Sequence, residues 1–168
     1  MKDVVPAEGA ATLWDLPLQG TILSTGETFA QELVFNGGTG ARPYADGLSA
    51  TAFPSGVMGS LIEITESTTP LLVRQREFRQ NSGGDGHFKG GDGQVIMVEA
   101  VEDTELTIYG TVDRVHYPAR GRNGGNSGET GAFVHSAGVP FDGKGSCRLK
   151  AGETLTVYTP GGGGYGRP

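Results

Sequence analysis

Arginine side chains on one expected strand carry the first candidate chemistry. In the stretch LLVRQREFR, an alternating strand puts Arg74 and Arg76 on one face and Arg79 on the other. Arginine suits the recognition of carboxylates and phosphates because its planar fork offers paired donors. An ion-paired sheet face or a subunit contact is the alternative interpretation of these arginines, and it is the favoured one.

A glycine-crowded stretch, SGGDGHFKGGDG at residues 82–93, raises the possibility of a phosphate cradle. A P-loop requires Gly-Lys-Ser/Thr after a strand and at the start of a helix. Here Lys89 is followed by two glycines and then by an expected strand, so both the P-loop and the dinucleotide fingerprint fail. An anion nest built from backbone amides stays open. The favoured interpretation is a strand-linking loop whose glycines permit positive φ and close approach of a partner subunit.

A metal site or a nucleophile finds little support in the residue spacing. Asp85, His87 and Asp92 fall within eight residues and could contact one ion, but they lack the spacing of an EF-hand loop. The three histidines are far apart, and no Cys-x-x-Cys pair is present. Cys147 lies in an expected strand, where a small buried core residue is the better interpretation. We therefore expect no catalytic residue and no metal bound by this chain.

The elements that must position these residues are short strands. They are rich in β-branched and aromatic residues and bounded by Gly, Pro, Asn or Asp, and no sustained helical period interrupts them. The sequence predicts one mainly β domain over residues 1–168, an antiparallel sandwich or irregular barrel with long glycine-rich loops and little helix. KAGET reads as a tight hairpin turn before the last strand. The expected strands are 28–35, 60–67, 70–78, 94–101, 105–110, 146–150 and 154–159.

Long glycine-rich loops make this domain costly to order. The chain has 30 glycines among 168 residues, and residues 36–59 form a connection longer than compact domains usually contain. Arg42, Tyr44, Phe53 and Met58 argue against plain disorder of that connection. Because ordering each backbone residue costs about 1–2 kcal/mol, we expect a second chain to hold these loops in place.

Charge and hydropathy exclude several classes of partner. The net charge is −6 and the pI is near 5.0, which disfavours nucleic acids and anionic membranes. No apolar run approaches the length of a membrane span, and the first residues lack the apolar core of a signal peptide. A single cysteine permits no internal disulfide. We expect a soluble, cytoplasmic protein.

Several long motifs, in order, resemble one known family. The motifs are VPAEGA, LWDLPLQG, GGTGARPYADGLSATAFPSGV, ESTTPLLVRQREFRQNSGGDGHFKGGDGQ, DRVHYPARGRNGG and RLKAGETLTVYTPGGGGYGRP. On these motifs the chain is similar to the C-terminal part of the hydantoinase B proteins. These are large subunits of ATP-dependent hydantoin and lactam hydrolases, a subunit type shared by acetone and acetophenone carboxylases.

The resemblance implies a function for a fragment of this kind. Because only the final portion of the family is present, the chain looks like the small, gamma-type subunit of an acetophenone carboxylase-like enzyme. This implies larger hydantoinase A-type and B-type partner subunits. It also implies ATP, Mg²⁺ and bicarbonate used by the complex, none of them bound by this chain, and a possible divalent metal in the partners. A subunit of an ATP-dependent hydantoin or lactam hydrolase and a stand-alone β-rich binding module are the alternatives.

The resemblance transfers no catalytic residue. The residues expected to lie at an interface or near the substrate are basic or acidic loop and strand residues, together with the one histidine of the glycine-crowded stretch. They are Arg42, Arg74, Arg76, His87, Asp113 and Arg114.

Overall fold

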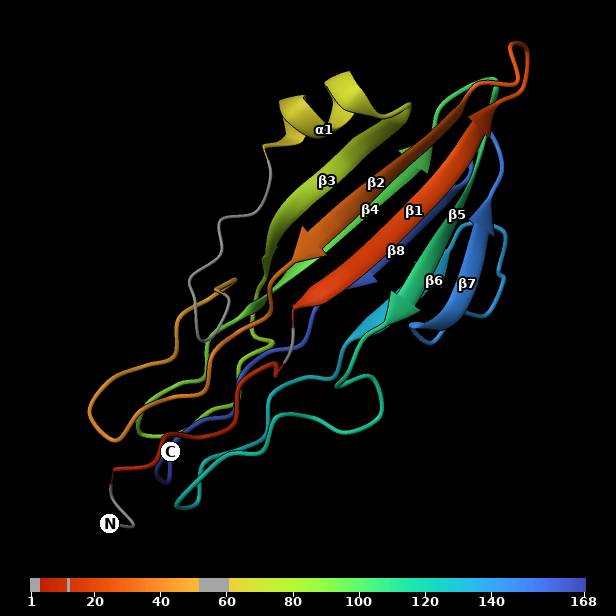
Figure 1. Ribbon diagram of the computed structural model, residues 1–168. Helices are drawn as coiled ribbons and strands as arrows, with labels where there is room; N and C mark the ends of the chain where they lie inside the picture. The colour runs from red at the N-terminus through yellow and green to blue at the C-terminus, as the bar shows by residue number, and fades with distance from the viewer. Residues whose placement is uncertain (1–3, 12, 52–60) are drawn as a thin grey trace.

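Two antiparallel sheets make up the folded body in the computed structural model, which describes residues 4–11, 13–51 and 61–168 (Figure 1). The predicted sandwich is confirmed, and the described strands do not close into a barrel. The first sheet has the order β2 (Thr28–Phe35), β1 (Trp14–Ile22), β5 (Thr104–Thr111) and β7 (Lys144–Leu149). The second has the order β3 (Leu71–Arg79), β4 (Gly93–Ala100), β8 (Thr154–Tyr158) and β6 (Ala132–His135).

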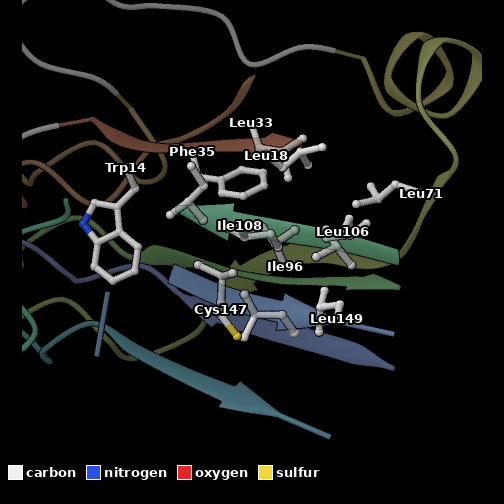
Figure 2. Packing of buried hydrophobic residues seen from close by; sticks show 14 of the residues in the cluster. Trp14, Leu18, Leu33, Phe35, Leu71, Ile96, Leu106, Ile108, Cys147 and Leu149 are labelled. Carbon is white, nitrogen blue, oxygen red and sulfur yellow. The ribbon is translucent and has the colours of Figure 1, made fainter. Parts of the chain in front are cut away.

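The core lies between the sheets and follows the period-two alternation of the strands. In β4, Ile96 and Val98 point inward and are almost fully buried. Trp14 lies at one end of the packed row and Leu71 at the other (Figure 2), and the Trp14 ring stacks on Phe133. Burying each such side chain contributes about 1.5–3 kcal/mol. The described core is Trp14, Leu16, Leu18, Leu33, Phe35, Leu71, Ile96, Val98, Ala100, Leu106, Ile108, Val112, Cys147, Leu149, Leu155 and Val157.

Cys147 is part of this core, as its position in an apolar strand predicted. Its side chain is buried, and this burial raises the pKa of the thiol. A protonated, enclosed thiol is a poor nucleophile. Cys147 therefore acts as a small packing residue.

Two strands, β1 and β6, were not predicted from the sequence. Pro17 lies within β1, and proline cannot donate a hydrogen bond to a ladder. β1 pairs with β2 along most of its length but with β5 only from Leu18 onward, so Pro17 has no partner on the β5 side. β6 has only four residues and carries little signal.

The turn at KAGET forms where it was predicted, but it does not close a hairpin. Gly152 occupies the turn with φ of +78°. The strand before it, β7, pairs with β5, whereas the strand after it, β8, pairs with β4 and β6. This turn carries the chain from one sheet to the other.

The strand predicted at 60–67 is wrong: the structure has helix α1 at Ile62–Thr68. Threonine hydroxyls bond back to carbonyls one turn earlier, as from Thr68 Oγ1 to the Ile64 carbonyl at 2.9 Å. Glu66 accepts a bond from the Val73 amide of the next strand at 2.8 Å, which anchors α1 beside β3 (Figure 1). The contact of α1 with β3 thus outweighs the alternating sequence pattern that predicted a strand at 60–67. No helix in the described part of the chain is long and apolar enough to cross a lipid bilayer.

Beyond one end of the sandwich, extended segments lie side by side, and the C-terminus is found there (Figure 1). We call this region the glycine bundle. It has almost no regular secondary structure, yet its segments are joined by backbone hydrogen bonds. Its segments are residues 6–10, 37–41, 82–92, 119–129 and 160–166.

The tail PGGGGYG forms the centre of the glycine bundle. Gly162 donates to Gly91 and accepts from Gly84, with N···O distances of 2.9 and 2.8 Å. Gly163 donates to the carbonyl of Glu8 at 2.8 Å, and Gly161 donates to that of Glu129 at 3.1 Å. The tail therefore bonds to the segments that surround it and is buried by them.

Close backbone approach explains the glycines of the bundle. A Cβ on Gly38 would lie 1.8 Å from the carbonyl oxygen of Gly91, and one on Gly162 would lie 2.0 Å from that of Thr39. No glycine of residues 82–93 has a positive φ, so that part of the prediction is wrong. The close approach predicted for these glycines exists, but it is to segments of the same chain.

Candidate functional site

A cavity of about 370 Å³ with converging charged groups lies between the first segment of the glycine bundle and residues 36–51. Its volume falls in the range typical of small-molecule sites. Apolar side chains and bare glycine backbone make up most of its wall, with two arginines and one glutamate. The lining is Pro6, Ala7, Glu8, Gly9, Ala10, Ala11, Leu13, Asn36, Gly37, Gly38, Thr39, Gly40, Arg42, Leu48, Thr51 and Arg114.

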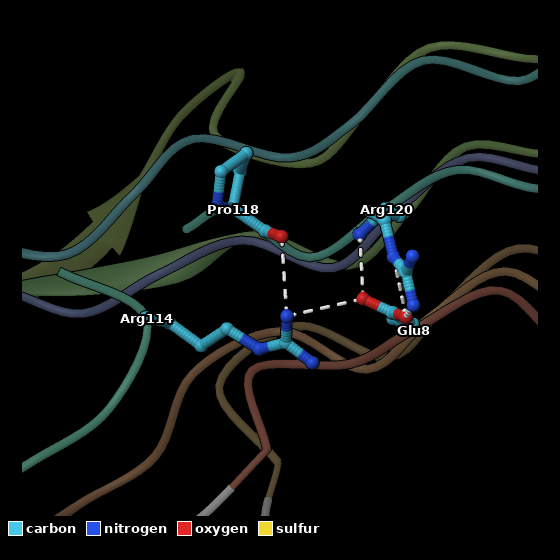
Figure 3. Close-up of polar contacts among 4 residues, drawn as sticks. All are labelled: Glu8, Arg114, Pro118 and Arg120. Atoms are coloured by element: carbon cyan, nitrogen blue, oxygen red, sulfur yellow. Dashed lines mark hydrogen bonds and ion pairs between the residues drawn. The ribbon is translucent and has the colours of Figure 1, made fainter. Parts of the chain in front are cut away.

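Glu8 is the centre of an ion cluster on one wall of this cavity (Figure 3). Its Oε2 accepts from Arg114 Nη1 and from the Arg120 backbone amide, both at 3.0 Å. Its Oε1 accepts from Arg120 Nε at 2.7 Å. The hydrogen bonds from Arg120 and the charge of Arg114 hold the pKa of Glu8 at about 2. The carboxylate is charged at neutral pH, and its oxygens are already engaged.

Arg114 is held on the cavity wall through a single nitrogen. Its Nη1 donates both to Glu8 and to the Pro118 carbonyl, the latter at 3.2 Å (Figure 3). The side chain is largely buried. Because its bonds to described residues all use Nη1, its other nitrogens are left to contact a ligand.

Arg42 supplies a second guanidinium to the lining. Its Nη2 donates to the Asp46 carbonyl at 3.0 Å, and its Cζ lies 5.7 Å from the centroid of the Tyr44 ring. Within residues 4–11, 13–51 and 61–168 it forms no ion pair with a carboxylate. Two arginines and one glutamate give the described residues of the lining a net charge of +1.

Backbone strain is concentrated at the same cavity. Among described residues other than glycine, asparagine and aspartate, the left-handed region is occupied by Ala11, Ala50 and Arg114, with φ of +71°, +48° and +65°. Ala11 and Arg114 line the cavity, and Ala50 precedes the lining residue Thr51. Such conformations cost about 1–3 kcal/mol each and gather at ligand sites. The described lining has no histidine, cysteine or lysine, and its two arginines are groups that bind anions.

Of the six predicted site residues, Arg42 and Arg114 are brought together by the fold, on the wall of this cavity. Asp113 is adjacent to Arg114 in sequence but is exposed, and it pairs with Lys144 at 3.5 Å. His87 lies in the glycine bundle, edge-on to the ring of Phe88.

The two arginines of β3 do not share a face, which contradicts the prediction. A bulge between Val73 and Gln75 inserts Arg74 as an extra residue, so the alternation shifts by one position. Arg74 is exposed and makes a two-pronged ion pair with Glu99, at 2.7 and 2.9 Å. Arg76 registers with the core residue Ile96 and lines a small gap near α1. The favoured interpretation, an ion-paired sheet face, holds for Arg74.

The carboxylates considered for a metal in residues 82–93 have a different role. Asp92 Oδ1 accepts from the Gly83 amide at 2.8 Å and so closes the loop on itself. Among the described residues, no group of three or more His, Cys, Asp or Glu side chains is placed to hold a metal ion. Residues 52–59 of the predicted loop 36–59, with Phe53 and Met58, lie outside the described residues.

Sequence reasoning missed Glu8 and Arg120, which organise the cavity wall. They are 112 positions apart, and no local pattern connects them. Glu8 lies in the motif VPAEGA and Arg120 lies in YPARGRNGG, but neither residue was singled out within its motif. A pairing across such a distance comes from the glycine bundle, which brings residues 6–10 against residues 119–129.

Comparisons with known proteins find a matching family and several relatives. A family model described as hydantoinase B/oxoprolinase matches residues 1–168. The 5-oxoprolinase 1 of Arabidopsis thaliana is 37% identical over 145 residues, which are 83% of this chain and 11% of that protein. Caprolactamase subunit beta of Pseudomonas jessenii is 29% identical over 146 residues, or 78% of this chain and 24% of that subunit.

The fold also matches a solved structure. Nucleotide-free acetone carboxylase, from work on ATP-dependent acetone carboxylation, superposes with a TM-score of 0.75 at 20% sequence identity. The match covers 96% of this chain and 26% of that chain. The chain thus spans between about a tenth and about a quarter of the length of these relatives.

Proposed function

The chain belongs to the hydantoinase B/oxoprolinase family, and from this membership we propose that it is the small accessory subunit of an ATP-dependent, acetophenone carboxylase-like enzyme. In this proposal residues 1–168 are one domain equivalent to the C-terminal part of hydantoinase B. Larger hydantoinase A-type and B-type subunits complete the enzyme in the cytoplasm. ATP activates an aromatic ketone as a phosphorylated intermediate, which carbon dioxide derived from bicarbonate then carboxylates to a β-keto acid.

One observation carries this proposal: the hydantoinase B/oxoprolinase family model matches residues 1–168. The superposition on acetone carboxylase, which comes from work on ATP-dependent acetone carboxylation, supports the carboxylase reaction. In our proposal ATP, Mg²⁺ and bicarbonate act in the partner subunits. The role of this chain is to complete the assembly.

The test is isolation of the native particle through an affinity tag on this chain. We expect larger hydantoinase-type subunits to copurify and acetophenone to be consumed only when both ATP and bicarbonate are present. A lactam supplied in place of the ketone is the matched control substrate. Recovery of the tagged chain as a monomer without companions would overturn the proposal.

A subunit of an ATP-dependent lactam or hydantoin hydrolase is the second candidate, favoured by the 5-oxoprolinase and caprolactamase relatives. The same preparation distinguishes the two reactions. Ring opening that needs ATP but not bicarbonate identifies the hydrolase, whereas a requirement for bicarbonate identifies the carboxylase.

A stand-alone β-rich binding module is the third candidate. The observation in its favour is that the glycine bundle satisfies many of its backbone hydrogen bonds within the chain. A monodisperse monomer with a cooperative thermal transition that a ligand raises would support it.

A further inference from the structure

We propose that the cavity lined by Arg42 and Arg114 binds a small organic monocarboxylate with an apolar body. This inference does not depend on which reaction the complex performs. It rests on four features of the cavity: the charge of its lining, a glutamate whose oxygens already accept hydrogen bonds, an apolar wall and a strained backbone.

The charge of the wall selects an anion. Arg42 has no carboxylate partner among the described residues, and Arg114 keeps nitrogens that its bonds to Glu8 and Pro118 do not use. Guanidinium groups bind carboxylates through two parallel N–H···O bonds. A ligand with one negative charge balances the net +1 of the lining.

Glu8 does not offer a competing cation site. Its carboxylate accepts hydrogen bonds from Arg114, from the Arg120 backbone and from the Arg120 side chain. A metal ion or an ammonium group would have to displace these charge-assisted bonds. Glu8 instead fixes Arg114 on the wall.

The remaining wall selects the body of the ligand. Pro6, Ala10, Leu13 and Leu48 present apolar side chains, and glycines 37, 38 and 40 present bare backbone. A dianionic phosphate would leave this apolar surface in contact with a strongly hydrated group, which is unfavourable. A hydrocarbon body attached to a carboxylate covers the apolar surface and lets its charge reach the arginines.

The strained residues support a site and not a packing defect. Ala11 and Arg114 are far apart in the sequence, yet both have left-handed backbone conformations and both line this cavity. Strain that is kept at a cavity is consistent with preorganisation for a ligand. The cavity is therefore shaped before the ligand arrives.

The probes are benzoate and its neutral isostere benzamide, titrated into the ¹⁵N-labelled full chain while amide resonances are followed. We expect benzoate to shift resonances of Ala10 and Gly37–Gly40 saturably, and benzamide to bind at least tenfold more weakly. Arg42→Met should weaken benzoate binding at least tenfold and leave benzamide binding unchanged. Arg74→Met, which removes an exposed arginine elsewhere, should change neither.

Three outcomes would overturn the inference. The first is equal binding of benzoate and benzamide, which would mean that charge plays no part. The second is a set of shifted resonances away from the cavity lining. The third is the absence of saturable shifts with both benzoate and hexanoate in a folded chain. Hexanoate is included so that a poor fit of the aromatic ring is not mistaken for failure of the site.

Discussion

The sandwich and the glycine bundle are stabilised in opposite ways. In the sandwich, side chains such as Ile96 and Leu155 fill the space between two sheets, and the backbones of the sheets stay apart. In the bundle, the backbones themselves are in contact, and a single added carbon atom at Gly38 or Gly162 would overlap a carbonyl group. The sandwich therefore depends on its buried side chains, whereas the bundle depends on glycines that let its backbones approach one another.

The magnitudes explain why the two regions need each other. Ordering a backbone residue costs about 1–2 kcal/mol, and glycine is at the costly end. An intramolecular hydrogen bond contributes a net of about 0.5–1.5 kcal/mol to stability. In the bundle on its own, the cost of ordering the backbone and the gain from hydrogen bonds are thus of similar size. The bundle is ordered because it is attached to a sandwich with a hydrophobic core.

The largest expected effect comes from adding a methyl group at the centre of the bundle. Gly162→Ala places a Cβ 2.0 Å from the Thr39 carbonyl oxygen, where only backbone could move aside. We expect the free energy of unfolding to fall by about 3 kcal/mol or more, through overpacking and lost hydrogen bonds. Urea titration followed by Trp14 fluorescence measures it.

Gly9→Ala is the matched control for that substitution. A Cβ there would lie 3.4 Å or more from its neighbours, so we expect a change within about 0.5 kcal/mol. Equal effects of the two variants would show that backbone contact does not hold the bundle together.

Removing carbon atoms from the sandwich should cost a similar amount. Leu155→Ala empties a fully buried position on β8, and such truncations cost about 2–5 kcal/mol because the core relaxes only in part. Val134→Ala, on the exposed face of the neighbouring strand β6, is the control and should have little effect. Hydrogen exchange then separates the regions: the Leu155 variant should open both, since the bundle depends on the sandwich. Unchanged bundle protection in that variant would contradict this dependence.

An intermediate effect is expected at the junction between the regions. The Thr159 hydroxyl donates to the Asn36 carbonyl at 3.0 Å and accepts from the Gln94 amide at 2.7 Å, and the residue is fully buried. Thr159→Val keeps the shape but leaves both groups without this partner, which costs about 1–3 kcal/mol. Thermal unfolding should show the loss, and Thr111→Val at an exposed position should not. A neutral result at Thr159 would mean that the regions are joined by packing alone.

The smallest effect concerns pH and the Glu8 cluster. The pKa of Glu8 is lowered from 4.5 to about 2 in the folded chain. The associated stability is complete above pH 4.5 and is lost as the pH falls toward 2, because the unfolded chain takes up the proton first. We expect a loss on the order of 1 kcal/mol, since the carboxylate is partly exposed.

Glu8→Gln should remove this part of the acid dependence, whereas Glu102→Gln at an exposed turn should keep it. Unfolding free energies between pH 2 and pH 6 provide the measurement. Parallel curves for the wild-type and Glu8→Gln chains would show that the cluster does not contribute to stability.

The two regions also differ in how far sequence could predict them. Alternation of apolar residues gave β2 its bounds at 28–35, because a half-buried strand repeats every second residue. A glycine carries no such pattern: Gly38 and Gly162 approach partners far away in the chain, and nothing nearby identifies them. Helix α1 and the Arg74 bulge were missed because contacts with other elements decide both.

The candidate site was predictable only in part. Arg42 and Arg114 were singled out as charged loop residues, but their common cavity depends on the path of residues 6–11. Glu8 could not be connected with Arg120 without the fold. A residue's chemistry can be read from the sequence, whereas its partners across 112 positions cannot.

The high glycine content of the glycine bundle has a consequence for the response of the molecule to cold. Exposing apolar surface raises the heat capacity on unfolding, whereas exposing peptide groups lowers it. The hydrophobic contribution of the sandwich weakens on cooling, and the backbone contacts of the bundle do not share this cause. We therefore expect cooling to weaken the layer of leucine and valine side chains more than the backbone contacts of the bundle.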